Sequence, residues 1–211
     1  MKKSFSLLEI ILVISLIGLL YTIFLPKQNN NKLDELTNRL SMYISTLRYK
    51  ALIDDKYDSD NSLWHKQRWT IKFFRCRKSV GGIYYIIYSD RNNSGHPRIE
   101  DSLKDSLTNK NIYSTNQCTQ NNENSEYVLL TKNFGISDIN ITCNDTTSLG
   151  QLSFGNDGKV YTKLSAFENT STEYELNSKC IIKLITNDNK SSEIEIYPYT
   201  SYNKKQIRDN K

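Results

Sequence analysis

Glu9 is the only charged side chain within the run from Phe5 to Leu25, whose other residues are apolar or small and uncharged. A carboxylate in such surroundings is costly unless it is paired, so it is a functional candidate by default. Its natural partner is a fixed positive charge at the same depth. Cleavage of the chain between Ser4 and Phe5 would create one, the new α-amino group of Phe5.

Four cysteines form the second set of reactive residues. Their spacing is not that of a zinc ribbon or of a Cys-x-x-Cys redox motif, and His65 and His96 are the only histidines. An even number of cysteines outside the cytoplasm indicates two disulfides, for which three pairings are open. We favour Cys76–Cys118, which ties a long loop to the first strand, and Cys143–Cys180, which ties two later strands together.

Catalytic motifs are not found in the sequence. It has no Gly-x-Ser-x-Gly, no phosphate-binding loop and no metalloprotease helix, and with two histidines it is poor in general bases. We therefore expect a protein that is not an enzyme and that needs no metal or other cofactor.

The apolar residues are concentrated at the N-terminus of a chain that is otherwise polar. The 211 residues have a mean hydropathy of −0.59 and a net charge of +5. As a helix, the run from Phe5 to Leu25 spans about 31 Å, close to the thickness of a bilayer core. Lys2 and Lys3 before it predict a single-pass protein of the bacterial inner membrane with a cytoplasmic N-terminus and a periplasmic globular domain.

The first residues resemble a known processing signal. Lys2-Lys3-Ser4-Phe5-Ser6-Leu7-Leu8-Glu9 and the apolar run after it are similar to the N-terminus of type IV pilins and type II secretion pseudopilins. The resemblance implies cleavage and methylation at Ser4/Phe5 by a prepilin peptidase, with Glu9 as the fifth mature residue and Pro26 where many members have a helix-kinking proline. It also implies, as partners, other pilins in a helical filament and an inner-membrane assembly platform. Ser4 stands where the family usually has glycine.

A second helix is predicted from the spacing of apolar residues between Leu33 and Leu52, which form one stripe with a polar opposite face. With the first run it gives one long helix, kinked or briefly interrupted near Pro26 and the cluster Asn29-Asn30-Asn31. A free amphipathic helix and a coiled coil are the alternatives.

The rest of the chain alternates as strands do. Strands are expected around Trp69–Phe73 and Gly82–Asp90, and then at Tyr127–Leu130, Ile139–Thr142, Gln151–Phe154, Val160–Thr162, Cys180–Ile185 and Glu193–Tyr197. Asn156-Asp157-Gly158 and Asn187-Asp188-Asn189 are typical of hairpin turns. One short helix is expected around Asp101–Leu107. The predicted fold is α+β, with a long N-terminal helix, half membrane-embedded and half amphipathic, packed on a C-terminal antiparallel β domain.

Five segments follow from these patterns. They are a leader peptide (1–4), a transmembrane and filament-core helix (5–25), its amphipathic continuation (26–55), a β-rich globular domain (64–202) and a basic tail (203–211). Within the globular domain, Leu152–Val160 and Ile194–Tyr202 resemble the hairpin and last strand of H-type minor pseudopilins, with Ser201 in place of a glycine.

The tail carries Lys204, Lys205, Arg208 and Lys211 against Asp209, next to Tyr197, Tyr199 and Tyr202. Cations can bind DNA phosphates, and tyrosines can stack on bases. The simpler alternative is a frayed, solvated C-terminus. Three functions thus remain open: a minor pseudopilin of a type II secretion or transformation-type pseudopilus, a DNA-contacting pilin subunit of a DNA-uptake pilus, and a single-pass protein with an extracytoplasmic β domain and no role in a filament. The segment between Asp90 and Asp101 resembles a calcium loop, but its positive charges favour a polar turn.

Overall fold

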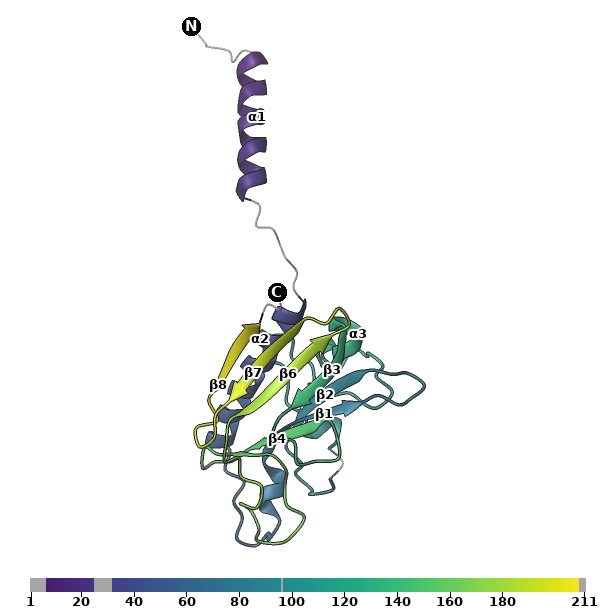
Figure 1. The fold of residues 1–211 in the computed structure, drawn as a ribbon, viewed down its shortest axis with the longest axis vertical. Coiled ribbons are helices and arrows are strands. Elements are labelled where there is room, and N and C mark those ends of the chain that lie inside the picture. Colours follow the sequence, from purple (N-terminus) through teal and green to yellow (C-terminus); the bar gives the residue numbers. More distant parts are fainter. Residues whose placement is uncertain (1–6, 25–31, 96, 209–211) are drawn as a thin grey trace. The chain divides into compact units, whose positions relative to one another are not determined.

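The computed structural model describes residues 7–24, 32–95 and 97–208. The chain divides into two compact units, Met1–Asn31 and Lys32–Lys211. The first contains helix α1 (Leu7–Phe24), and the second contains every other helix and strand (Figure 1).

The predicted long N-terminal helix, and with it the predicted fold class, is wrong. Two separate helices occur instead, because α1 ends at Phe24 and α2 runs over Lys32–Ile53 in the other unit. The sequence between them gives a physical reason. Pro26 lacks the backbone donor that a helix interior needs, and asparagine has a weak helix propensity, so the cluster Asn29-Asn30-Asn31 does not favour continuation.

The predicted placement in a membrane is also wrong. Among the described residues, no helix combines the length and the apolarity that a membrane crossing requires. This finding overturns the predicted single-pass location in the inner membrane.

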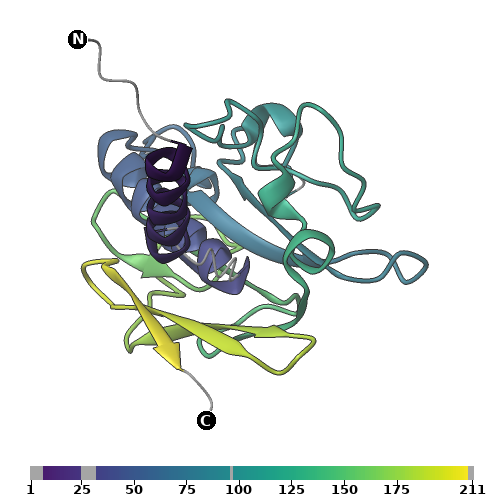
Figure 2. The same cartoon turned by 90° about the horizontal axis from the view of Figure 1, so that it is seen from above.

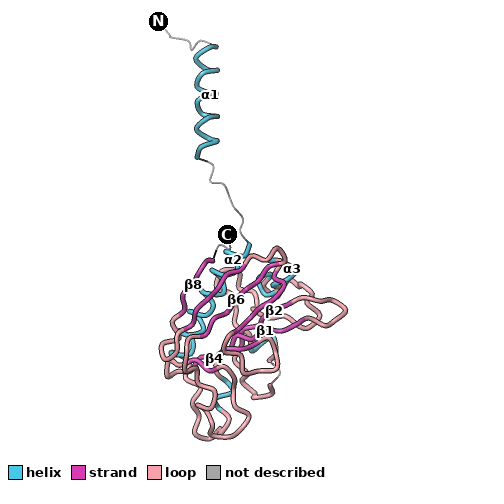
Figure 3. The backbone as a smooth tube through the Cα atoms, viewed as in Figure 1, coloured by secondary structure: helices cyan, strands magenta, loops and turns pink. Residues whose placement is uncertain are grey.

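Two four-stranded antiparallel sheets form the framework of the second unit. The first has the order β2-β1-β4-β5 and the second the order β3-β6-β7-β8. The strands are β1 (Trp69–Arg75), β2 (Ile83–Tyr88), β3 (Ile136–Ile141), β4 (Gly150–Phe154), β5 (Val160–Tyr161), β6 (Cys180–Thr186), β7 (Ser191–Ile196) and β8 (Asn203–Arg208). Their connections include long loops, drawn in pink in Figure 3.

The core of this unit is built around α2. The apolar stripe predicted from the sequence is buried from Leu33 to Ala51, whereas Leu52 is exposed. The stripe contacts strands of both sheets, above all β7, β8 and β1. The buried apolar residues of α2 are Leu33, Leu36, Leu40, Tyr43, Ile44, Leu47 and Ala51. Neither a free helix nor a coiled coil is formed. In Figure 2 the strands β6, β7 and β8 of the second sheet, in yellow and yellow-green, follow one side of the unit.

Hairpins and strands that depend on local sequence were predicted well. Asn156-Asp157-Gly158 joins β4 to β5, and Asn187-Asp188-Asn189 joins β6 to β7. Gly158 supplies the left-handed conformation of its turn, with a φ of 77°.

Two local predictions are wrong. The strand expected at Tyr127–Leu130 is replaced by two short helices, η3 (Glu126–Val128) and α3 (Leu130–Phe134). The Ser125 hydroxyl caps the first, and Gly135, at a φ of 70°, ends the second. The helix expected around Asp101–Leu107 is a single turn, η2 (Ile99–Asp101); another turn, η1 (Trp64–Gln67), precedes β1.

Candidate functional site

Glu9 lies in the first turn of α1, where the positive end of the helix dipole favours a carboxylate. The large apolar side chains described on this helix, from Leu7 to Leu20, are between 49% and 79% exposed. They surround the helix instead of forming one stripe, so the chain presents an apolar surface that burial against another molecule would stabilise. The predicted processing residues Ser4 and Phe5, and also Pro26, lie outside the described residues.

Both disulfides connect elements of the second unit. Cys76 after β1 bonds Cys118 in the long loop, with 5.9 Å between their Cα atoms. Cys143 after β3 bonds Cys180 at the start of β6, with 5.3 Å between Cα atoms. These are the two pairs favoured from the sequence, and no described cysteine is free.

The C-terminal basic segment is the edge strand β8, so the expectation of a frayed tail is wrong for Asn203–Arg208. Side chains on alternate positions of this strand reach α2. Lys205 forms an ion pair with Asp34 and donates a hydrogen bond to Asn38 at 3.0 Å. Asn203 donates to the hydroxyl of Ser45 at 2.9 Å. β8 is thereby fixed along the helix.

Lys204 and Lys205, two of the three predicted DNA-contacting residues, have different surroundings. Lys205 is directed to Asp34 of α2, whereas the exposed Lys204 pairs across the sheet with Glu195. The pKa of Glu195 is lowered mainly by the hydrogen bond from Lys179, and the charge of Lys204 contributes to the shift. Arg208 belongs to β8, where it pairs with Ser191 of β7. Contact of this strand with DNA stays a prediction.

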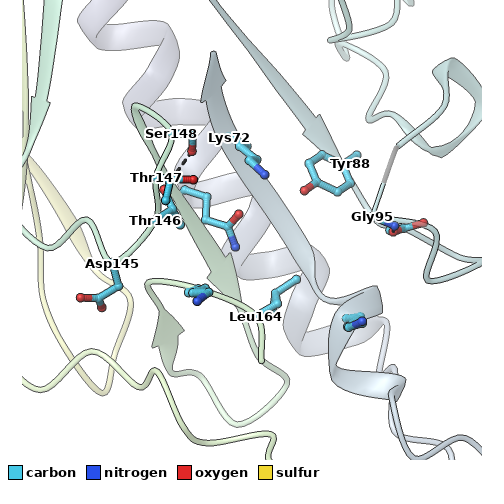
Figure 4. Close-up of a pocket in the computed structure, with 12 residues that line it drawn as sticks. Lys72, Tyr88, Gly95, Asp145, Thr146, Thr147, Ser148 and Leu164 are labelled. Atoms are coloured by element: carbon cyan, nitrogen blue, oxygen red, sulfur yellow. Dashed lines mark hydrogen bonds between the residues drawn. The ribbon is translucent and has the colours of Figure 1, made fainter. Parts of the chain in front are cut away.

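A cavity of about 330 Å³ lies beside the first sheet, and sequence reasoning missed it. Lys72 of β1 stands next to Gln151 of β4 in the register of the sheet, and Tyr88 lies two residues further along β2. The loop that follows β3 adds Thr146, Thr147 and Ser148. Figure 4 shows the Lys72 amino group and the Tyr88 hydroxyl pointing toward the same space.

Charge in this cavity is unequally neutralised. Lys66 and Lys163 line it together with Lys72, and none of the three forms an ion pair with any of the described residues. Burial lowers the pKa of Lys72, because the surroundings solvate its charged form poorly. The signal in the sequence was Lys72, a lysine within the run Trp69–Phe74, whose other residues are apolar or bear a hydroxyl.

The two carboxylates that line the cavity already accept hydrogen bonds from other residues. Asp90 accepts hydrogen bonds from the backbone amides of Ser94 and Gly95, the second at 2.7 Å. Asp145 accepts from the hydroxyl of Thr162, and Figure 4 shows its carboxylate directed away from Lys72. The expected polar turn after the Tyr88 strand is therefore confirmed.

Among residues 7–24, 32–95 and 97–208, the structure gives no support for metal binding or for acid–base catalysis by histidine. No group of three or more His, Cys, Asp or Glu side chains there could hold a metal ion. His65 is buried and its Nε2 atom bonds the carbonyl of Ser165 at 3.1 Å. Burial lowers its pKa, which keeps the ring neutral.

Comparisons with models of protein families, with curated proteins and with solved structures gave no match to this chain.

Proposed function

We propose that this chain is a minor pseudopilin, a structural subunit of a type II secretion or transformation-type pseudopilus. The observation that carries the proposal is Glu9, the one carboxylate of α1, placed in the first turn of a helix whose described apolar side chains are exposed. Such a surface is suited to packing against copies of the same helix or against related subunits.

The order of residues before α1 supports the same function. Lys2, Lys3, Ser4 and Phe5 precede the apolar helix in the arrangement of a prepilin signal. A prepilin peptidase that cuts between Ser4 and Phe5 leaves an α-amino group four residues from Glu9. In a filament, the carboxylate of one subunit accepts this amino group from its neighbour. Misregister would leave a buried charge without a partner, which is costly, so the pair fixes the register of the subunits.

The second unit contributes the surface of the subunit. Its helix α2 is buried against two antiparallel sheets, and two disulfides stabilise the connections between them. A rigid domain of this kind suits a structural subunit that has to keep its shape in an assembly.

Processing provides the first test. The full chain is expressed with and without a prepilin peptidase, and its N-terminus is determined by mass spectrometry. The proposal predicts a chain that starts at Phe5 and carries one additional methyl group. Ser4→Gly should be cut at least as well, whereas Ser4→Asp should not be cut. An intact N-terminus under conditions that process a known pilin would overturn the proposal.

Assembly provides the second test. Glu9→Gln removes the charge and keeps the size of the side chain, and Glu35→Gln on the exposed face of α2 is the matched control. We expect cross-linked oligomers of the processed chain to be lost in the first variant and kept in the second. Oligomers that form equally well in both would exclude the charge pairing.

A further inference from the structure

We propose that the cavity beside Lys72 binds an anionic monosaccharide, that is, a hydroxylated sugar ring that carries a phosphate or carboxylate group. This inference goes beyond the structural role proposed above and does not depend on it. It rests on the cavity between β1, β2, β4 and their loops.

The cationic part of the cavity can hold the anionic group. Lys66, Lys72 and Lys163 come from η1, from the middle of β1 and from the loop after β5, and all three line the cavity. The amino group of Lys163 also lies over the ring of Tyr174, 4.8 Å from its centroid. In the described part of the chain, none of the three lysines is neutralised by a carboxylate, whereas Lys159, Lys179 and Lys183 elsewhere all are. An anion placed among three lysines forms charge-assisted hydrogen bonds, which are stronger than neutral ones.

Lys72 is the central residue of this group. Its side chain leaves the face of the sheet opposite α2, and its amino group lies 5.2 Å from the centre of the Phe74 ring. It forms no hydrogen bond or ion pair with any described residue. Partial burial of the Lys72 charge is therefore unfavourable, because no counter-ion within the described chain offsets it. A bound anion would stabilise the charge.

The remaining lining suits a sugar ring. Thr146, Thr147 and Ser148 bring hydroxyl groups, and Thr146 and Ser148 bond each other at 2.8 Å. The side-chain amide of Gln151 makes no hydrogen bond with any described residue, so it is available as both donor and acceptor. Tyr88 adds a hydroxyl on the opposite side. Several donors and acceptors around one cationic centre fit a ligand with an anion and several hydroxyls.

The size of the cavity sets the size of the ligand. At about 330 Å³ it is near the lower end for small-molecule sites, a size that accommodates one sugar ring.

Binding is tested with the purified full chain. Glucose 6-phosphate and glucuronic acid are titrated by isothermal calorimetry, with glucose and inorganic phosphate as comparisons. We expect one site with a dissociation constant below about 1 mM for at least one of the two anionic sugars. Glucose and inorganic phosphate should each bind at least about tenfold more weakly. No saturable binding, or equal binding of phosphate or glucose, would overturn the proposal.

Variants locate the site. Lys72→Gln should weaken binding about tenfold or more, because it removes a charged contact. Lys163→Gln, in the loop after β5, should do the same and covers the case in which Lys72→Gln does not fold. The control is Lys104→Gln, which makes the same charge change on an exposed lysine outside the cavity. If all three variants bind as the unaltered chain does, or lose affinity equally, the site lies elsewhere. Since the processing test above concerns the N-terminus alone, either proposal can fail without the other.

Discussion

Buried polar side chains fix α2 to the loop that covers it. The hydroxyl of Tyr43 donates to the carboxylate of Asp105 at 2.8 Å, and Arg39 lies 3.8 Å from the same carboxylate. The Arg39 guanidinium also stacks on the ring of Tyr127, 3.2 Å from its centroid. These groups stabilise the fold only while each keeps its partner, because a buried polar atom without one is costly.

Asp105→Asn should lower the free energy of unfolding by about 1–3 kcal/mol at pH 7. Burial by itself would raise the pKa of Asp105, but hydrogen bonds from the Leu107 amide and from Tyr43 outweigh it and lower the pKa. The folded state therefore binds fewer protons than the unfolded chain. The contribution of the carboxylate is complete above about pH 4 and is lost as the pH falls through the folded-state pKa.

Urea unfolding at neutral and at acidic pH checks this prediction. The difference between Asp105→Asn and the unaltered chain should shrink on acidification. Asp60→Asn, on an exposed turn, is the control and should stay within about 0.5 kcal/mol at both pH values. A difference that does not change with pH would contradict the assignment to the charged carboxylate.

Ser201 combines a strained backbone with a buried hydrogen bond. Its φ is 48°, and its hydroxyl donates to the carbonyl of Gly158 at 2.7 Å, which joins the turn before β8 to the β4–β5 hairpin. Ser201→Ala keeps the strain and loses the bond, so we expect a loss of about 1–2 kcal/mol in stability. Ser201→Gly should lose less, because glycine adopts this conformation freely. Thermal unfolding of the two variants side by side tests the order; a greater loss for glycine would contradict it.

At the scale of elements, the attachment of β8 to α2 depends on charge. Lys205→Asp or Asp34→Lys alone brings like charges together, and each should destabilise the edge strand. The double variant restores opposite charges in reversed positions. We expect it to recover most of the loss, with a coupling of about 0.5–1 kcal/mol for a partly exposed pair. Denaturant titrations of the four chains give this coupling; a value of zero would mean that backbone pairing with β7 alone holds the strand.

The disulfides act on the loops between strands. Cys143 and Cys180 are 37 residues apart, and Cys76 and Cys118 are 42 apart. The chain-entropy description gives about 4 kcal/mol for closing loops of this length. Replacing both cysteines of one pair by serine should therefore lower stability by about 2–4 kcal/mol in either case. Unfolding with and without a reductant checks this, since each variant should respond only to reduction of its remaining bond.

At the scale of the whole molecule, the buried core is confined to the second unit. Its buried apolar residues run from Leu33 to Ile196, and α1 belongs to the other unit. A chain of residues 32–211 should therefore have the same free energy of unfolding as the full chain, within about 0.5 kcal/mol. It should also lose any oligomers that depend on α1. Size-exclusion chromatography and urea titration measure both properties, and a large loss of stability would show that α1 supports the second unit.

The sequence by itself determined the features that depend on local pattern. The apolar stripe from Leu33 to Leu52 requires a helix with one buried face, and the Asn-Asp-Gly turn requires a hairpin, because both signals lie within a few residues. The cysteine pairs favoured from the sequence also occur in the structure.

Only the tertiary structure decided what depends on distant residues. The predicted strand at Tyr127–Leu130 is wrong: this segment forms two short helices and bridges β2 only at Leu129, which pairs with Tyr84. Asn203–Arg208 becomes a strand because β7 and α2 provide its partners. The cavity around Lys72 combines residues from η1, β1, β2, β4 and three loops, which are far apart in the chain. No local period brings such residues together, since their proximity follows from sheet register and loop packing.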